Sequence, residues 1–126
     1  HIDYQFPLLG NRYLVFRQRR PLPLPVATTA VAFMVYGDNS TTMLKLWLKD
    51  SRNTIVQLPV APLGPAQWRR VVTNIPAEFP RWDVIRGDGH AVTPPFTIDA
   101  IILDDLPNGV GSSGTVVIDQ LEALWP

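Results

Sequence analysis

Three side chains that alternate along one short segment have the chemistry needed to hold a sugar. In the stretch 43–49, Lys45, Trp47 and Lys49 share one face of an extended strand, because successive side chains point to opposite faces. A sugar ring presents an apolar face of C–H groups and a rim of hydroxyls. An aromatic ring covers the first, and polar side chains bind the second. The set predicts a carbohydrate-binding face. The alternative is that Trp47 packs beneath a loop that crosses the sheet.

A second set of this kind lies in the long connection from Pro76 to Pro95. Trp82 stands there beside Arg81, and Asp88 follows in the same segment. Connections of this length often carry function. The segment therefore predicts a second contact with carbohydrate. The alternative is that Trp82 anchors the loop to the body of the protein.

Two carboxylates suggest a structural calcium ion. Asp3 lies in the first expected strand and Asp119 in the last, and the first and last strands of a sandwich are usually neighbours. Calcium takes six to eight oxygen ligands from carboxylates and backbone carbonyls. Asp3 and Asp119 are therefore the expected metal ligands. The alternative is that Asp119 caps an irregularity in its strand while Asp3 is solvated.

The residues needed for catalysis are sparse, so the chain is expected not to be an enzyme. The histidines are His1 and His90, and no Gly-x-Ser-x-Gly motif is present. Glycosidases need two carboxylates at a defined separation. Asp104 and Asp105 are adjacent in an expected strand, so they point to opposite faces. They are interpreted as part of a turn that continues through residues 106–109.

Charge and composition exclude several classes of partner. Eleven basic and eleven acidic residues cancel, which leaves no overall field to hold nucleic acid. Arg17, Arg19 and Arg20 form a basic cluster that is interpreted as a solvated strand edge. No apolar run approaches the roughly 20 residues that span a membrane, so no membrane partner is expected. The absence of cysteine excludes disulfides and thiol catalysis.

Short segments rich in β-branched and aromatic residues, separated by 13 prolines and 8 glycines, indicate an all-β chain. The expected strands are Ile2–Phe6, Tyr13–Gln18, Thr29–Tyr36, Met43–Lys49, Thr54–Pro59, Trp68–Ile75, Phe96–Leu103 and Thr115–Leu124. The stretch 37–40 is expected as a hairpin loop, and so is 50–53. The proline-rich stretch 22–25 predicts a crossover or a sheet edge. Together these segments predict one jelly-roll β-sandwich over residues 1–126.

Alternation within the strands predicts which faces are buried. Leu44, Leu46 and Leu48 are expected in the core. In 29–36 both faces are apolar, which predicts a central strand with a partly covered outer face. In 96–103, Ile98, Ala100 and Ile102 are expected on one common face. An irregularity is expected near Asp119.

Several motifs, in order, resemble one family. They are Ile2–Phe6, Phe33–Asp38, Leu44–Asp50, Trp68–Val71, Trp82, Asp88–Gly89, Pro95 and Gly114–Asp119. In this order they resemble the galactose-binding-like β-sandwich attached to bacterial phosphodiester glycosidases and to glycoside hydrolases. The resemblance implies that Trp68 is a core tryptophan. The loop Arg81–Gly87 departs from the family's tryptophan-glycine-glycine pattern, so a ligand different from the family's is expected if this loop shapes the binding site.

The resemblance implies a function. Such a module is non-catalytic and monomeric, and it belongs to a larger extracellular or cell-surface protein. It is expected to target the catalytic domain of the same polypeptide to a polysaccharide or cell-wall glycan. The alternative is a structural spacer that packs on the catalytic domain and has no ligand of its own.

Overall fold

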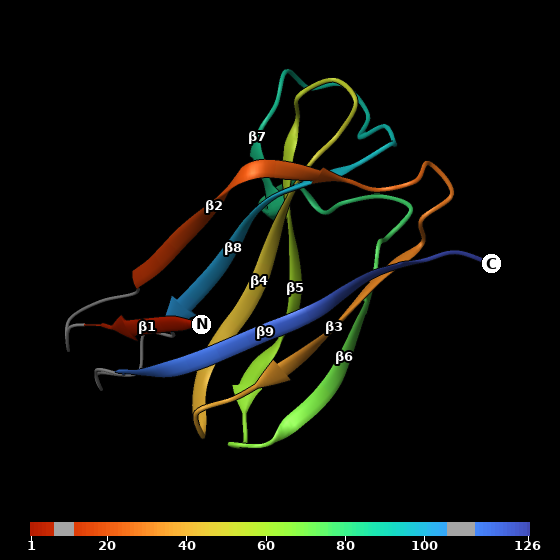
Figure 1. Ribbon diagram of the computed structural model, residues 1–126. Helices are drawn as coiled ribbons and strands as arrows, with labels where there is room; N and C mark the ends of the chain where they lie inside the picture. The colour runs from red at the N-terminus through yellow and green to blue at the C-terminus, as the bar shows by residue number, and fades with distance from the viewer. Residues whose placement is uncertain (7–11, 106–112) are drawn as a thin grey trace.

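The computed structural model describes residues 1–6, 12–105 and 113–126 as two antiparallel sheets that face each other (Figure 1). The four-stranded sheet has the order β1-β9-β3-β6. Its strands are β1 (Ile2–Gln5), β9 (Ser113–Leu124), β3 (Ala30–Tyr36) and β6 (Trp68–Asn74). The five-stranded sheet has the order β2-β8-β4-β5-β7. Its strands are β2 (Arg12–Pro23), β8 (Thr97–Asp105), β4 (Ser40–Lys49), β5 (Ile55–Gly64) and β7 (Val84–Arg86).

The eight expected strands are all present, and the all-β sandwich is confirmed. The long connection adds a 3₁₀ turn, η1 (Arg81–Asp83), and the short strand β7. Both β2 and β5 run further than predicted, through prolines. Pro23 lies in an edge strand. Pro62 lies beyond the two residues of β5 that pair with β7. Each of these prolines therefore has an unpaired strand side that its nitrogen can face, which is where a proline is tolerated in a sheet.

One apolar core fills the space between the sheets. It combines Val31, Phe33 and Val35 of β3 with Leu44 and Leu48 of β4, all at most 2% exposed. The predicted alternation of β4 is therefore confirmed. β3 lies between β9 and β6, as a central strand should. Burial of these side chains is the main stabilising term, at roughly 25 cal/mol per Å² of apolar surface.

The stretch 37–40 is not the predicted hairpin loop, because β3 and β4 belong to different sheets. The backbone of Gly37 lies so close to the backbone oxygens of residues 63–65 that a Cβ at this position would clash with them. Asp38 accepts a hydrogen bond from the Tyr4 hydroxyl of β1. These contacts turn the chain from one sheet to the other. The second predicted hairpin, 50–53, is confirmed by the pairing of β4 with β5.

A bulge in β8 overturns the predicted alternation of that strand. The register slips by one residue between Ile98 and Ala100, which leaves Asp99 without an opposing residue on β4. Ile98 therefore points into the core, whereas Ala100 and Ile102 pack with Trp47 on the outer face. One extra residue moves every later side chain to the other face.

A second bulge lies in β9, where an irregularity was predicted near Asp119. Ala32 pairs with Glu122 and Met34 pairs with Asp119, so two residues of β9 stand opposite one residue of β3. Gln120 takes a left-handed backbone conformation with φ of 53°. Asp119 Oδ1 accepts the Gln120 backbone N–H at 2.8 Å. The bulge therefore places Asp119 and Gln120 so that they line a hollow on each face of the four-stranded sheet.

Candidate functional site

The predicted face around Trp47 is closed. Trp47 is only 7% exposed, and its indole Nε1 donates a hydrogen bond to Gln57 Oε1 at 3.2 Å. The Arg17 guanidinium carbon lies 5.5 Å from the centre of the indole ring. Arg17 belongs to β2, two strands away in the sheet. The ring therefore has no open face on which a sugar could stack.

The charges beside Trp47 are neutralised within the protein. Lys45 Nζ lies 2.7 Å from Asp104 Oδ2, and Lys49 Nζ lies 3.8 Å from Asp99 Oδ1. Arg17 also pairs with Asp99, at 2.7 Å. The bulge in β8 places Asp99 where both cations reach it. On this outer face, these three ion pairs therefore lie over the small apolar cluster around Trp47.

Asp104 and Asp105 differ in surroundings, as strand alternation requires. Asp104 pairs with Lys45 on the outer face, and its Oδ1 is buried without a hydrogen-bond partner. Asp105 is 4% exposed. The turn predicted at residues 106–109 lies outside the described residues.

Of the second predicted set, Arg81 lines a hollow in the long connection, whereas Trp82 and Asp88 do not. Arg81 lines it from η1, and the strand β7 and the loop that follows it contribute much of the wall. The hollow has a volume of about 780 Å³. We call it the loop hollow; it is lined by Thr54, Phe79, Arg81, Val84, Ile85, Arg86, Gly87, Gly89, His90 and Val92. Trp82 is 81% exposed and is not among the residues that line it.

Two contacts hold this connection against the sheet. Asp50 Oδ2 accepts the backbone N–H of Thr93 at 2.9 Å. The Phe79 ring packs on Phe96 with 6.2 Å between centroids. The loop hollow is therefore attached at both ends, and its arginines are carried on an ordered turn and a paired strand.

Asp88 stands at the rim of the loop hollow. Its Oδ1 accepts the backbone N–H of His90 at 3.1 Å, and its Oδ2 lies 3.3 Å from His90 Nε2. The backbone hydrogen bond lowers the pKa of Asp88, and the nearby His90 and Arg52 charges act in the same direction. Both carboxylate oxygens of Asp88 therefore interact with His90, one with its backbone N–H and the other with its ring.

The two expected metal ligands do not meet. Asp3 pairs with Thr115 across β1 and β9, and Thr115 donates a side-chain hydrogen bond to it. Asp119 is four residues further along β9, roughly 13 Å at 3.3 Å per residue. Within the described ranges, no three metal-ligating side chains gather in one place. Calcium stays a prediction, but these two carboxylates cannot share one ion.

Sequence reasoning missed an exposed aromatic pair on the four-stranded sheet. Trp68 was expected in the core, and this was wrong, because it is 49% exposed on the outer face. Its ring meets Tyr36 edge-on, with 5.6 Å between centroids and 71° between planes. A hollow of about 200 Å³ beside it is lined by Met34, Trp68, Asp119 and Gln120. We call Trp68, Tyr36, Met34, Asp119 and Gln120 together the Trp68 platform.

Neighbouring residues hold the platform in place. Arg69, next to Trp68, donates hydrogen bonds to the backbone oxygens of Pro62 and Leu63. These bonds fix the start of β6 to β5 of the opposite sheet. Across the same outer face, Arg70 pairs with Glu122 at 3.3 Å. The outward position of Tyr36 in the 29–36 alternation was the available signal, but that face was expected to be partly covered.

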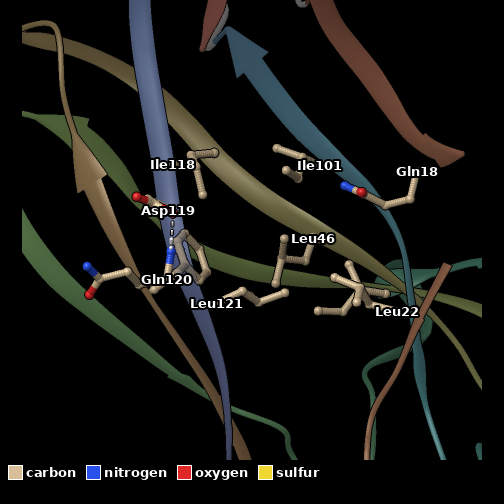
Figure 2. Close-up of a pocket in the computed structure, with 10 residues that line it drawn as sticks. Gln18, Leu22, Leu46, Ile101, Ile118, Asp119, Gln120 and Leu121 are labelled. Atoms are coloured by element: carbon tan, nitrogen blue, oxygen red, sulfur yellow. Dashed lines mark hydrogen bonds between the residues drawn. The ribbon is translucent and has the colours of Figure 1, made fainter. Parts of the chain in front are cut away.

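An apolar cleft opens between the sheets on the other side of the β9 bulge. Figure 2 shows Leu22, Leu46, Ile101, Ile118 and Leu121 around it. Its volume is about 270 Å³, and its polar side chains are Gln18, Asp119 and Gln120. The apolar lining offers few partners for sugar hydroxyls. The bulge therefore separates two hollows, of which the one beside Trp68 has the chemistry that suits a sugar.

Comparison with known proteins finds no relative of this chain. No protein-family model matches the sequence, and neither a curated protein nor a solved structure matches it. Within the described part of the chain, no helix is long and apolar enough to cross a bilayer.

Proposed function

We propose that the protein is a non-catalytic carbohydrate-binding module. The observation that carries the proposal is Trp68, a half-exposed indole that rests edge-on against Tyr36 and borders a hollow with Asp119 and Gln120. A ring held in this way loses little conformational freedom when a sugar stacks on it. Little binding energy is then spent on ordering the site.

The polar residues of the platform complement the ring. Asp119 offers carboxylate oxygens, of which Oδ1 already accepts the Gln120 N–H. Gln120 offers an amide oxygen and two N–H donors. A sugar that lies with its C–H face on Trp68 would direct equatorial hydroxyls toward these two side chains. The affinity for one sugar unit is expected to be weak, and it would be increased by proximity to a polymer.

We further propose that the sandwich is a jelly roll of the galactose-binding type, attached to the catalytic domain of a larger extracellular or cell-surface enzyme. Several consecutive strands alternate between the two sheets, as in a jelly roll. Two motifs of the resemblance have structural roles in this chain. Gly37 and Asp38 direct the crossing from β3 to β4, and Asp50 binds the backbone after β4.

The experiment is a calorimetric titration of wild type, Trp68→Ala and Val72→Ala with a panel of soluble neutral oligosaccharides. Val72 is the matched control, since it is also 49% exposed on β6 but does not line the hollow. We expect at least one glycan to bind. Trp68→Ala should weaken that binding at least tenfold, which corresponds to about 1.4 kcal/mol, and Val72→Ala should leave it unchanged. Equal binding by wild type and Trp68→Ala would contradict the proposed site.

The second candidate function is a spacer that packs on the catalytic domain. The observation in its favour is that Tyr36, Trp68 and Val72 are exposed together on one face, and apolar patches of this kind also mark protein contacts. A folded protein that binds no glycan in the panel would favour this alternative. Trp68→Ala would then weaken contact with the catalytic domain without affecting any soluble ligand.

A further inference from the structure

Some positively charged side chains of this protein pair with a carboxylate, and others do not. In the described residues, Lys45, Lys49, Arg17 and Arg70 have carboxylate partners. Arg69 instead donates to backbone oxygens. Among the described side chains, Arg19, Arg20, Arg81 and Arg86 have no ion-pair partner, whereas Arg52 lies near Asp88. Two of these, Arg81 and Arg86, line the loop hollow.

The loop hollow combines cations with an apolar wall. Arg81 and Arg86 line it together with His90. The apolar part of the wall comes from Phe79, Val84, Ile85 and Val92. Among the described residues, no carboxylate lines it. A solute in the hollow would meet two guanidinium groups and a C–H surface at the same time.

Asp88, the carboxylate between Gly87 and Gly89, does not pair with Arg81 or Arg86. Asp88 lies between the glycines of the rim, but both of its oxygens face His90. A Cβ at Gly89 would meet nothing within 4 Å, so the backbone there borders open space. Gly87 lies close to the Thr54 side chain, where a Cβ would be 3.0 Å from the methyl carbon. Arg81 and Arg86 are both exposed, so a solute can reach them from solvent.

We propose that the loop hollow binds an anionic sugar unit, either a uronic acid or a sulfated sugar. A guanidinium group presents parallel N–H donors that match a carboxylate or sulfate. The apolar side chains would cover the C–H face of the same ring. The sugar part of this assignment rests on the proposed function, whereas the anionic part stands on Arg81 and Arg86 alone. The site lies next to β7 of the five-stranded sheet, while the Trp68 platform lies on the four-stranded sheet.

The experiment compares ligands that differ in charge. The probes are trigalacturonate, its methyl ester and a sulfated galactose disaccharide. NMR of the arginine Nε–Hε groups of wild type locates the bound probe, and calorimetry measures its affinity for wild type, Arg81→Gln/Arg86→Gln and Arg19→Gln/Arg20→Gln. The last variant is the matched control, since it removes two exposed arginines of β2 that do not line the hollow. Circular dichroism checks that all variants are folded.

We expect one or both anionic probes to bind and the ester to bind at least about tenfold more weakly. Arg81→Gln/Arg86→Gln should cause a similar loss, and the β2 control should not. Raising the salt to roughly 0.5 M should weaken binding, because the groups are exposed. Binding by trigalacturonate alone assigns a uronate, and binding by the disaccharide alone assigns a sulfated sugar. Equal binding by acid and ester, equal binding by wild type and Arg81→Gln/Arg86→Gln, or no binding by either anionic probe would overturn the proposal.

Trp68→Ala separates this proposal from the proposed function. If trigalacturonate binds equally to wild type and Trp68→Ala while neutral glycans do not bind at all, the platform fails and the anionic site stands. If neutral glycans bind through Trp68 and the charged probes do not bind, the reverse holds.

Discussion

Asp50 connects three segments of the chain, and its removal should have a large and calculable effect. It follows β4 and is 5% exposed. Its Oδ1 accepts the backbone N–H groups of Arg52 at 2.9 Å and Thr54 at 2.8 Å. Its Oδ2 accepts the N–H of Thr93 at 2.9 Å. One carboxylate therefore closes the β4–β5 hairpin and binds the end of the long connection.

The cost of Asp50→Ala follows from the burial of each donor. Thr54 is 3% exposed, so its N–H would lose its partner without gaining water, which costs about 1–3 kcal/mol. Arg52 and Thr93 are exposed, so water would replace the carboxylate at about 0.5–1 kcal/mol each. The free energy of unfolding should fall by about 3 kcal/mol. For a chain of this length, that lowers the melting temperature by on the order of 10 °C.

Urea denaturation followed by tryptophan fluorescence measures the free energy of unfolding, and amide hydrogen exchange measures the local effect. Exchange in residues 87–93 should speed up more in Asp50→Ala than exchange in β3. Ser51→Ala is the control. It removes a side-chain bond to the Thr93 oxygen, but the Ser51 N–H still donates to that oxygen at 3.0 Å. Its cost should stay below about 0.5 kcal/mol. An Asp50→Ala protein as stable as wild type would refute this account of the loop.

Three further outcomes are expected. Trp47→Ala should cost about 3–5 kcal/mol, as for other buried aromatic residues, and glycan binding by the folded fraction should be unchanged; calorimetry and thermal unfolding check both. Burial raises the pKa of the Tyr4 hydroxyl, and its hydrogen bond to Asp38 acts in the same direction. The stability from this raised pKa is present below pH 10 and is lost as the pH rises through the folded-state value, so Tyr4→Phe should lose less stability than wild type in alkaline urea titrations. Gly37→Ala should cost about 3 kcal/mol, because its Cβ would press on backbone that cannot move aside. Gly89→Ala is the comparison: its Cβ would meet nothing within 4 Å, so it should cost only the roughly 1–2 kcal/mol of a left-handed alanine at φ of 86°, and chemical denaturation compares the two.

Local pattern was enough to predict most elements of this protein. The positions of the eight main strands, the core face of β4 and the irregularity near Asp119 were predicted from alternation and turn residues. These features depend on the two-residue period of a strand and on the backbone preferences of a few residues. Both are properties of neighbours in sequence.

The predictions that were wrong depended on contacts between distant residues. The bulge at Asp99 reversed one face of β8, and the stretch 37–40 crossed between sheets instead of forming a hairpin. Neither follows from the local sequence alone, since the bulge depends on the register of β8 against β4, and the crossing depends on the approach of Gly37 to residues 63–65.

The sequence by itself determined that Trp47 and its lysines face outward from the sheet. Only the tertiary structure decided that this outward ring is covered and that Trp68 is not. A strand's alternation fixes the side of the sheet to which a side chain points, but its exposure depends on the side chains of neighbouring strands. Over Trp47, Arg17 arrives from β2 because a buried carboxylate on β8 holds it there. Beside Trp68, the bulge of β9 bends the strand and leaves a hollow.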